Sequence, residues 1–176
     1  YFQVISVGTT TGFANADSSV WPGFSILLLL FFTFQCACSG STTGGIKVDR
    51  VWIFLKSFKS SILKQIHPNA VIPVKVGEHT IDKETVSSVT LFISVYIAIV
   101  FIVALLLTLM GVEITDAFTG SAANMGNVGQ GFGSVGSICN YSAFPEIVKF
   151  LLSVEMLLGR VEIYSIILMF IIFRRR

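Results

Sequence analysis

The chain has 176 residues, of which 53% are hydrophobic and only 12% are charged, and its formal net charge is +2. Soluble domains carry about a quarter of their residues as charged side chains, so this composition argues against a soluble enzyme or a disordered tail. The small net charge gives no reason to expect a nucleic-acid partner. Three cysteines are too few for the disulfide framework of a small secreted protein. The sequence therefore predicts an integral membrane protein.

Three apolar runs are long enough to cross a bilayer as helices, which takes about 20 residues. They are residues 20–38, 85–112 and 150–173. Backbone in lipid must satisfy its own hydrogen bonds, so each run is expected to be helical. The third run is unusual because Glu155, Arg160 and Glu162 lie inside it. No initiator Met or signal peptide opens the chain, which is therefore expected to be a fragment.

Basic residues set the expected orientation. Seven of the 12 Lys and Arg residues fall in residues 47–84, and three more end the chain. The positive-inside rule places both regions in the cytoplasm, so residues 113–149 and the N-terminal stretch face outside. Within the first basic region, residues 46–66 are weakly amphipathic, and the segments around Gly77 predict a short hairpin.

Two glycine-containing segments carry most of the functional information. They are residues 9–14 (TTTGFA) and residues 124–133 (NMGNVGQGFG). The second follows residues 114–123, an apolar stretch too short to cross, and precedes a full span. This order is typical of a re-entrant loop, which is tolerated at membrane depth only where it lines a water-filled path or is buried in protein. Glycine at positive φ can turn carbonyls toward one axis, where they replace the water shell of an ion.

The glycine-rich segments also have other interpretations. Residues 131–136 fit G-x-G-x-x-G, but a dinucleotide site needs a strand before the motif and a helix directly after it. Residues 40–47 resemble a phosphate-binding loop, but they lack its adjacent Gly-Lys-Ser/Thr. Both glycine segments could also be plain flexible outer loops.

A further glycine-rich stretch, residues 39–45, follows the first apolar run. It is expected to break that helix near its inner end. One interpretation is a helix C-cap followed by a cytoplasmic loop. The other is a mobile loop inside a permeation path.

Together these segments resemble the Trk/Ktr/HKT superfamily of potassium transporters, in particular its TrkH-like membrane subunits. Members have four repeats of helix, pore loop and helix around one ion path, and the resemblance covers the second half of that architecture. It implies an all-α integral membrane fold with re-entrant pore loops. Residues 1–46 would hold the third-repeat pore loop, its inner-lining helix and an intramembrane loop, residues 47–84 a cytoplasmic helix extension and hairpin, and residues 85–176 the fourth repeat.

The resemblance also implies the ion-binding residues, with K⁺ as the ion. In the third repeat they are Thr10, Thr11, Gly12 and Phe13, and in the fourth Asn127, Val128, Gly129 and Gln130. Gly12 and Gly129 fall on the filter glycine of the family. Gln130 stands where the family often has Pro, which leaves the local geometry there open.

A gate is expected in the intramembrane loop together with a buried cation. Its residues would be Gly40, Ser41, Thr42, Thr43, Gly44, Gly45 and Arg160. A mid-span Arg costs roughly 2.5–3.5 kcal/mol on insertion scales, so Arg160 should have partners. Its five donors could hold several loop acceptors. The alternative is an interhelical ion pair with no gating role.

The leading hypothesis is K⁺ uptake across the bacterial plasma (inner) membrane, without catalysis and without a cofactor bound by this chain. The resemblance implies a homodimer embedded in lipid and a cytoplasmic, nucleotide-binding RCK-type regulatory subunit that contacts residues 47–84. The sequence leaves open K⁺ against Na⁺ and a channel against an H⁺ or Na⁺ symporter. The alternatives are a non-transporting structural or assembly subunit and, more remotely, a membrane oxidoreductase.

Overall fold

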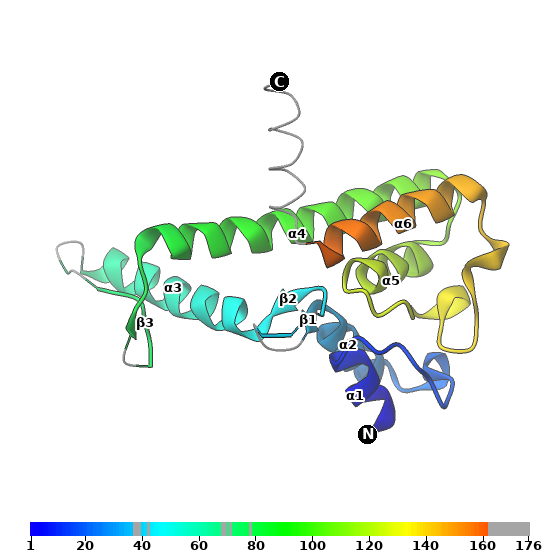
Figure 1. Cartoon of the computed structure of the whole chain (residues 1–176), viewed down its shortest axis with the longest axis horizontal. Coiled ribbons are helices and arrows are strands. Elements are labelled where there is room, and N and C mark those ends of the chain that lie inside the picture. Colours follow the sequence, from blue (N-terminus) through cyan, green and yellow to red (C-terminus); the bar gives the residue numbers. More distant parts are fainter. Residues whose placement is uncertain (37–39, 42, 68–69, 71, 78, 162–176) are drawn as a thin grey trace.

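The computed structural model describes residues 1–36, 40–41, 43–67, 70, 72–77 and 79–161. These residues form helices joined by loops, and two short strand pairings lie between them (Figure 1). The all-α class predicted from the sequence is therefore what the described chain adopts.

The N-terminal part contains α1 (Phe2–Gly8), the 3₁₀ turn η1 (Ser18–Val20) and α2 (Gly23–Phe34). The prediction of one continuous span over residues 20–38 is wrong, because α2 has 12 residues and ends at Phe34. At 1.5 Å per residue it is about 18 Å long, roughly half the membrane thickness.

A strand pairing ends α2. Gln35 adopts an extended backbone, and β1 (Gln35–Cys36) pairs in parallel with β2 (Ile46–Lys47). The chain that leaves α2 thus returns to the same place before α3 begins. Hydropathy could not reveal this break, because the apolar run continues through it and the partner strand lies ten residues further along the chain.

The basic region forms α3 (Val48–Ile66) and then an antiparallel hairpin of β3 (Lys75–Val76) and β4 (His79–Thr80). Gly77 lies in the turn at φ +63°, a backbone conformation that glycine adopts without strain. The predicted amphipathic helix and hairpin are both confirmed.

The C-terminal part contains α4 (Lys83–Leu109), α5 (Ile114–Met125), the 3₁₀ turns η2 (Gly133–Val135) and η3 (Tyr141–Ala143), and α6 (Glu146–Arg160). Within the described chain, α4 is the one helix that is long and apolar enough to cross a membrane. At 27 residues it is about 40 Å long. The predicted third span is helical as far as Arg160, and its remainder lies outside the described residues.

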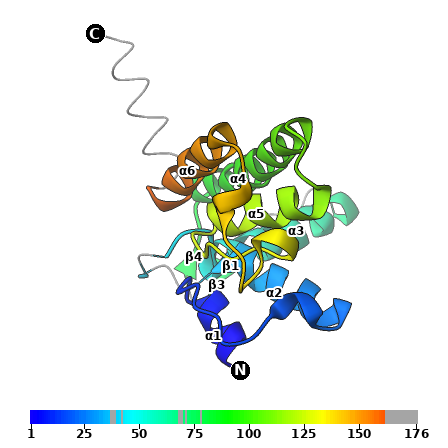
Figure 2. The same cartoon turned by 90° about the vertical axis from the view of Figure 1, so that its right-hand side faces the viewer.

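Two parts of the molecule are distinguishable in space. The arm consists of α3 beside the N-terminal half of α4, with the hairpin at its end, and the body contains α1, α2, α5 and α6 around the other half of α4 (Figures 1 and 2). Helix α5 packs against α2, α4 and α6. Tyr96 and Val100 of α4 meet Ala122 and Met125 of α5 in the main apolar cluster. The short helix α5 is therefore the centre of the body.

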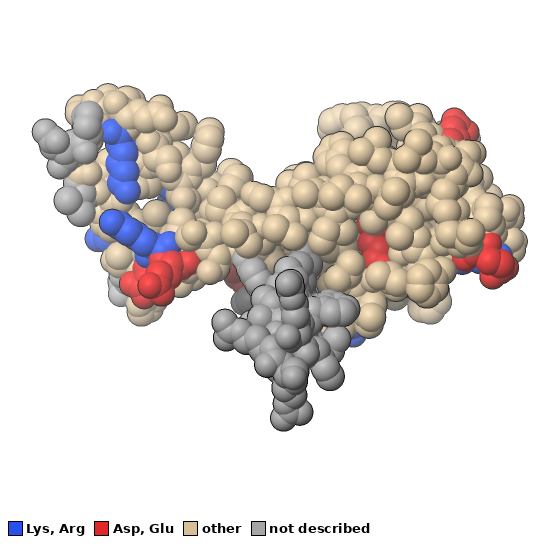
Figure 3. Space-filling view, turned by 90° about the horizontal axis from the view of Figure 1, so that it is seen from above, with Lys and Arg blue, Asp and Glu red and all other residues tan. Residues whose placement is uncertain are grey.

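Charged side chains gather toward the ends of the molecule. Figure 3 shows Lys and Arg at the end of the arm, and the exposed middle of that face is largely uncharged. Acidic side chains appear at the opposite end and beside the basic group. The predicted cytoplasmic position of the arm, which is based on these basic residues, stays a prediction.

Candidate functional site

Two glycine loops follow the same backbone path. We call residues 9–14 the first glycine loop and residues 126–133 the second. In each, successive amides after a short helix donate back to carbonyls of its last turns. The bonds are Thr9 to Ile5, Thr10 to Val7 and Thr11 to Ser6 in the first loop, and Gly126 to Ala122, Asn127 to Asn124 and Val128 to Ala123 in the second. Donors and acceptors correspond one to one, so the loops are structural repeats.

In both loops, a residue with a left-handed backbone conformation (positive φ) recurs two positions later. Thr10 and Asn127 lie at φ +54° and +57°, and they are the non-glycine residues with positive φ among those described. Two positions later, Gly12 and Gly129 lie at φ +74° and +86°, as predicted for the two glycines. In a regular strand, successive peptide units face opposite sides. Inserting left-handed residues turns successive carbonyls toward one side instead.

Several carbonyl oxygens of these loops have no protein donor. Those of Thr10, Thr11, Asn127 and Val128 accept no hydrogen bond from any residue that the structure describes. Val128 is buried, Thr10 and Asn127 are half-buried and Thr11 is exposed. Carbonyl oxygens without a protein donor can coordinate a cation.

The two glycine loops touch each other. A Cβ atom on Gly12 would lie 2.2 Å from the carbonyl oxygen of Val128, so a side chain at position 12 cannot coexist with the second loop. Further out, the side chains of Ser18 and Ser137 are hydrogen-bonded. Segments more than a hundred residues apart therefore meet at two levels, and the predicted residues Gly12 and Val128 are brought together.

A tyrosine side chain is hydrogen-bonded to the second glycine loop. The hydroxyl of Tyr141 donates to the carbonyl oxygen of Gly129 at 3.1 Å and accepts from the side-chain amide of Asn124 at 3.1 Å. Burial raises the pKa of Tyr141 to about 12, so the hydroxyl keeps its proton and remains a donor. The sequence analysis did not identify Tyr141, because nothing in its local pattern indicates this contact.

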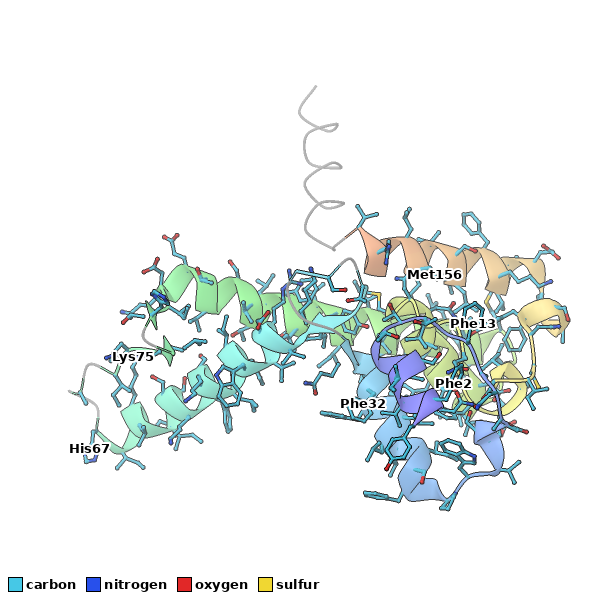
Figure 4. All side chains as sticks on the ribbon, turned by 60° about the horizontal axis from the view of Figure 1, so that its bottom comes forward. Phe2, Phe13, Phe32, His67, Lys75 and Met156 are labelled. Carbon is cyan, nitrogen blue, oxygen red and sulfur yellow. The ribbon has the colours of Figure 1, made fainter. Side chains whose placement is uncertain are left out.

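The outer predicted ion-binding residues behave differently. The carbonyl oxygen of Phe13 accepts from Ser6 Oγ at 2.6 Å, and the Phe13 side chain is exposed. Figure 4 shows Phe13 in the body of the molecule. Gln130 is half-buried, and its Oε1 has no hydrogen-bond partner among the described residues. The role predicted for both stays a prediction.

The glycine-rich stretch of residues 39–45, which we call the intramembrane loop after its predicted position, reaches the second glycine loop through its described residues. A Cβ on Gly44 would lie 2.9 Å from Asn127 Nδ2 and 3.0 Å from the Gly126 carbonyl oxygen. Gly44 and Gly45 are buried, whereas Gly40 is exposed. Of the other predicted gating positions, Ser41 and Thr43 are half-buried and Thr42 lies outside the described residues.

Helix α6 approaches the same place from the other side. A Cβ on Gly159 would lie 2.0 Å from the carbonyl oxygen of Met125, the last residue of α5. Arg160 is exposed at the end of α6, and no hydrogen bond or ion pair joins its side chain to another residue in the described part of the chain. The predicted contact between Arg160 and the intramembrane loop therefore stays a prediction.

A buried carboxyl group connects α4, α5 and α6. Glu155 is 1% exposed, and its Oε1 lies 2.5 Å from Ser121 Oγ, which also contacts the Val100 carbonyl oxygen at 3.1 Å. This chain of contacts links α6, α5 and α4. The sequence marked Glu155 as unusual but gave no partner for it.

Comparison with known proteins gives one consistent result. A family model described as "TrkH: Cation transport protein" matches residues 1–175. "Trk system potassium uptake protein TrkH" of Halomonas elongata is 37% identical over 169 residues, and that of Escherichia coli K12 is 36% identical over 171 residues. "Trk system potassium uptake protein TrkG" of the same E. coli strain is 35% identical over 170 residues. The matches cover 96–97% of this chain and 35% of each relative, so the chain spans about a third of their length.

A solved structure agrees. The crystal structure of the potassium transporter TrkH from Vibrio parahaemolyticus matches with a TM-score of 0.86 at 34% identity, covering 96% of this chain and 36% of that one. The match confirms the predicted resemblance and the all-α membrane fold. It also agrees with the prediction of a multi-pass membrane protein.

Proposed function

The chain belongs to the TrkH family of cation transport proteins, and from this premise we propose that the full-length protein takes up K⁺ across the bacterial plasma membrane through a pore that this chain helps to form. One observation carries the proposal: two repeated glycine loops meet in the body and leave the carbonyl oxygens of Thr10, Thr11, Asn127 and Val128 without protein donors. Such oxygens can replace the hydration shell of a passing cation.

The electrostatics of the body favour a cation rather than an anion. Helix α5 ends at Met125, immediately before the second glycine loop. The C-terminal end of a helix carries a partial negative charge, so α5 stabilises positive charge at that loop. The N–H groups that would attract an anion point back into α5, since Asn127 and Val128 donate to its carbonyls.

The arm suits a cytoplasmic regulatory partner. Its surface carries the basic side chains of α3 and of the hairpin (Figure 3). In the proposed assembly a homodimer binds a nucleotide-binding RCK-type subunit through this arm. The intramembrane loop and Arg160 serve as the gate, because the loop already contacts the second glycine loop at Gly44.

Reconstitution tests the proposal. The full-length protein in liposomes should carry K⁺ in preference to Na⁺, and Gly129→Ser should weaken that preference. Gly129 lies at φ +86° with no atom of this chain within 4 Å of an added Cβ, so the substitution introduces mainly backbone strain of about 1–2 kcal/mol.

A matched control lies outside the glycine loops. Gly111, between α4 and α5, has φ +88° and equally open surroundings, so Gly111→Ser introduces the same strain elsewhere. The control should keep the K⁺ preference of the parent protein. No K⁺ flux from the parent, or equal effects of the two substitutions on selectivity, would refute the proposal. The first result would favour a structural subunit.

A further inference from the structure

The side chain of Asn127 lies between two glycines that belong to different elements. A Cβ on Gly44 would be 2.9 Å from Asn127 Nδ2, and a Cβ on Gly159 would be 3.0 Å from the same atom. A methyl group at either glycine would have to displace this amide. The amide therefore occupies a slot formed by the intramembrane loop and α6.

The amide is also bonded in this slot. Asn127 Nδ2 donates to the carbonyl oxygen of Met156 in α6 at 3.1 Å. Met156 lies in the body of the molecule, far from Lys75 and His67 at the end of the arm (Figure 4). The side chain of Asn127 thus joins α6 and contacts the intramembrane loop, whereas its backbone belongs to the second glycine loop.

The backbone of Asn127 joins two peptide planes that are held separately. The plane entering Asn127 is held by the hydrogen bond from its amide to Asn124, and the plane leaving it, which carries the Asn127 carbonyl, is held by the bond from the Val128 amide to Ala123. The torsion angles at Asn127, whose φ is +57°, set the angle between these planes and so the direction of the Asn127 carbonyl. A force on the side chain of Asn127 acts on those torsion angles directly.

We propose that Asn127 is a positioning residue that couples the intramembrane loop and α6 to the carbonyl orientation of the second glycine loop. The inference rests on the transport function proposed above and extends it, because it gives the gate a route to the ion-binding groups. When Gly44 moves, the slot changes width and the amide moves with it. The selectivity of the pore and the position of the gate are then linked through one side chain.

Three substitutions in the full-length protein separate the side chain from the backbone. Asn127→Gly removes the amide but keeps a residue that adopts positive φ readily, so the backbone carbonyls remain. Gly44→Ala inserts a methyl group into the slot. Gly23→Ala is the matched control, because it adds the same methyl group at the start of α2, outside the gate, where the added Cβ meets no described atom within 4 Å.

Thr10→Gly provides a second control, since Thr10 holds the corresponding left-handed position in the first glycine loop. This variant measures the effect of replacing a left-handed residue by glycine at a position that has no such slot. Flux of K⁺, the K⁺/Na⁺ ratio and the thermal midpoint would be measured for each variant and for the double variant Gly44→Ala with Asn127→Gly.

We expect Gly44→Ala to change the K⁺ flux about tenfold, which corresponds to about 1.4 kcal/mol, and Gly23→Ala to leave it unchanged. In the Asn127→Gly background, Gly44→Ala should have a smaller effect on flux and on the thermal midpoint, because the amide it displaces is absent and the contact with the Gly126 carbonyl oxygen at 3.0 Å remains. Asn127→Gly should alter the K⁺/Na⁺ ratio more than Thr10→Gly does.

The failures are distinguishable. If the parent protein carries no K⁺, the proposed function fails. If the parent carries K⁺ but Gly44→Ala and Asn127→Gly act independently in both flux and thermal midpoint, Asn127 does not couple the loop to the filter. Equal effects of Gly44→Ala and Gly23→Ala would also overturn the inference.

Discussion

Replacing Gly159 by Ala should push α6 away from the second glycine loop. The added Cβ would lie 2.0 Å from the carbonyl oxygen of Met125 and 2.9 Å from its carbonyl carbon. Both obstacles are backbone atoms of α5, so no side-chain rotation relieves the contact. The helices must separate by more than about 1 Å at this contact, since non-bonded heavy atoms pack at about 3.5–4 Å.

The separation has a cost in free energy that can be worked out in parts. Overpacking of this kind costs about 1–3 kcal/mol. A displacement of that size also stretches the contact of Glu155 with Ser121 and leaves a buried carboxyl group without its partner, at about 1–3 kcal/mol more. The higher helix propensity of alanine offsets about 1 kcal/mol of this destabilisation. The net destabilisation should therefore be about 1–5 kcal/mol.

The assay compares two glycines in helices of the body. Gly159→Ala in the full-length protein should lower the apparent thermal midpoint and the K⁺ flux. Gly120→Ala in α5 is the control, because its added Cβ meets its nearest neighbour, Val135 Cγ2, at an ordinary 3.7 Å. The control gains helix propensity without a collision. A Gly159→Ala protein as stable and as active as the Gly120→Ala protein would refute this reasoning.

Three further predictions test other contacts. Glu155→Gln should keep the thermal midpoint near that of the parent, because glutamine can still pair with α5, whereas Glu155→Ala should lower it; equal midpoints would show that the buried contact contributes nothing. Gly12→Ala combines about 1–2 kcal/mol of strain at φ +74° with a collision against the Val128 carbonyl, so K⁺ flux should fall steeply. Gly8→Ala, whose added Cβ meets no atom within 4 Å, should retain the flux, and loss of flux in both would disprove the explanation. A cysteine placed at Gly77 should react with an impermeant thiol reagent only from the cytoplasmic side, and labelling of intact cells there would reverse the predicted orientation.

Local sequence patterns predicted the elements whose causes are local. The short apolar stretch at residues 114–123 became α5, and the glycine between two β-prone segments became the hairpin turn at Gly77. The positive φ of Gly12 and Gly129 also followed from the expected loops. Each of these features depends on a residue type and its immediate neighbours.

The features that sequence reasoning missed depend on partners far along the chain. Helix α2 stops at Phe34 because the next residues pair with Ile46 and Lys47, and hydropathy carries no trace of that pairing. Gly159 is required because the carbonyl of Met125 lies against it. The sequence shows that a glycine is there but not what approaches it, so the slot around Asn127 could be found only from the structure.

The pairing of β1 with β2 has a consequence for how this protein can diverge between species. Gln35 faces Ile46 and Cys36 faces Lys47, so residues 37–45 begin and end at the same place. Doubling the length of such a closed segment costs only about 0.6 kcal/mol of chain entropy. Insertions and exchanges before Gly44 therefore need not disturb the helices on either side, whereas Gly44, which lies against Gly126, and Gly45, which is buried at φ +80°, restrict its end. The length and sequence of this segment can therefore change between species without changes in α2 or α3.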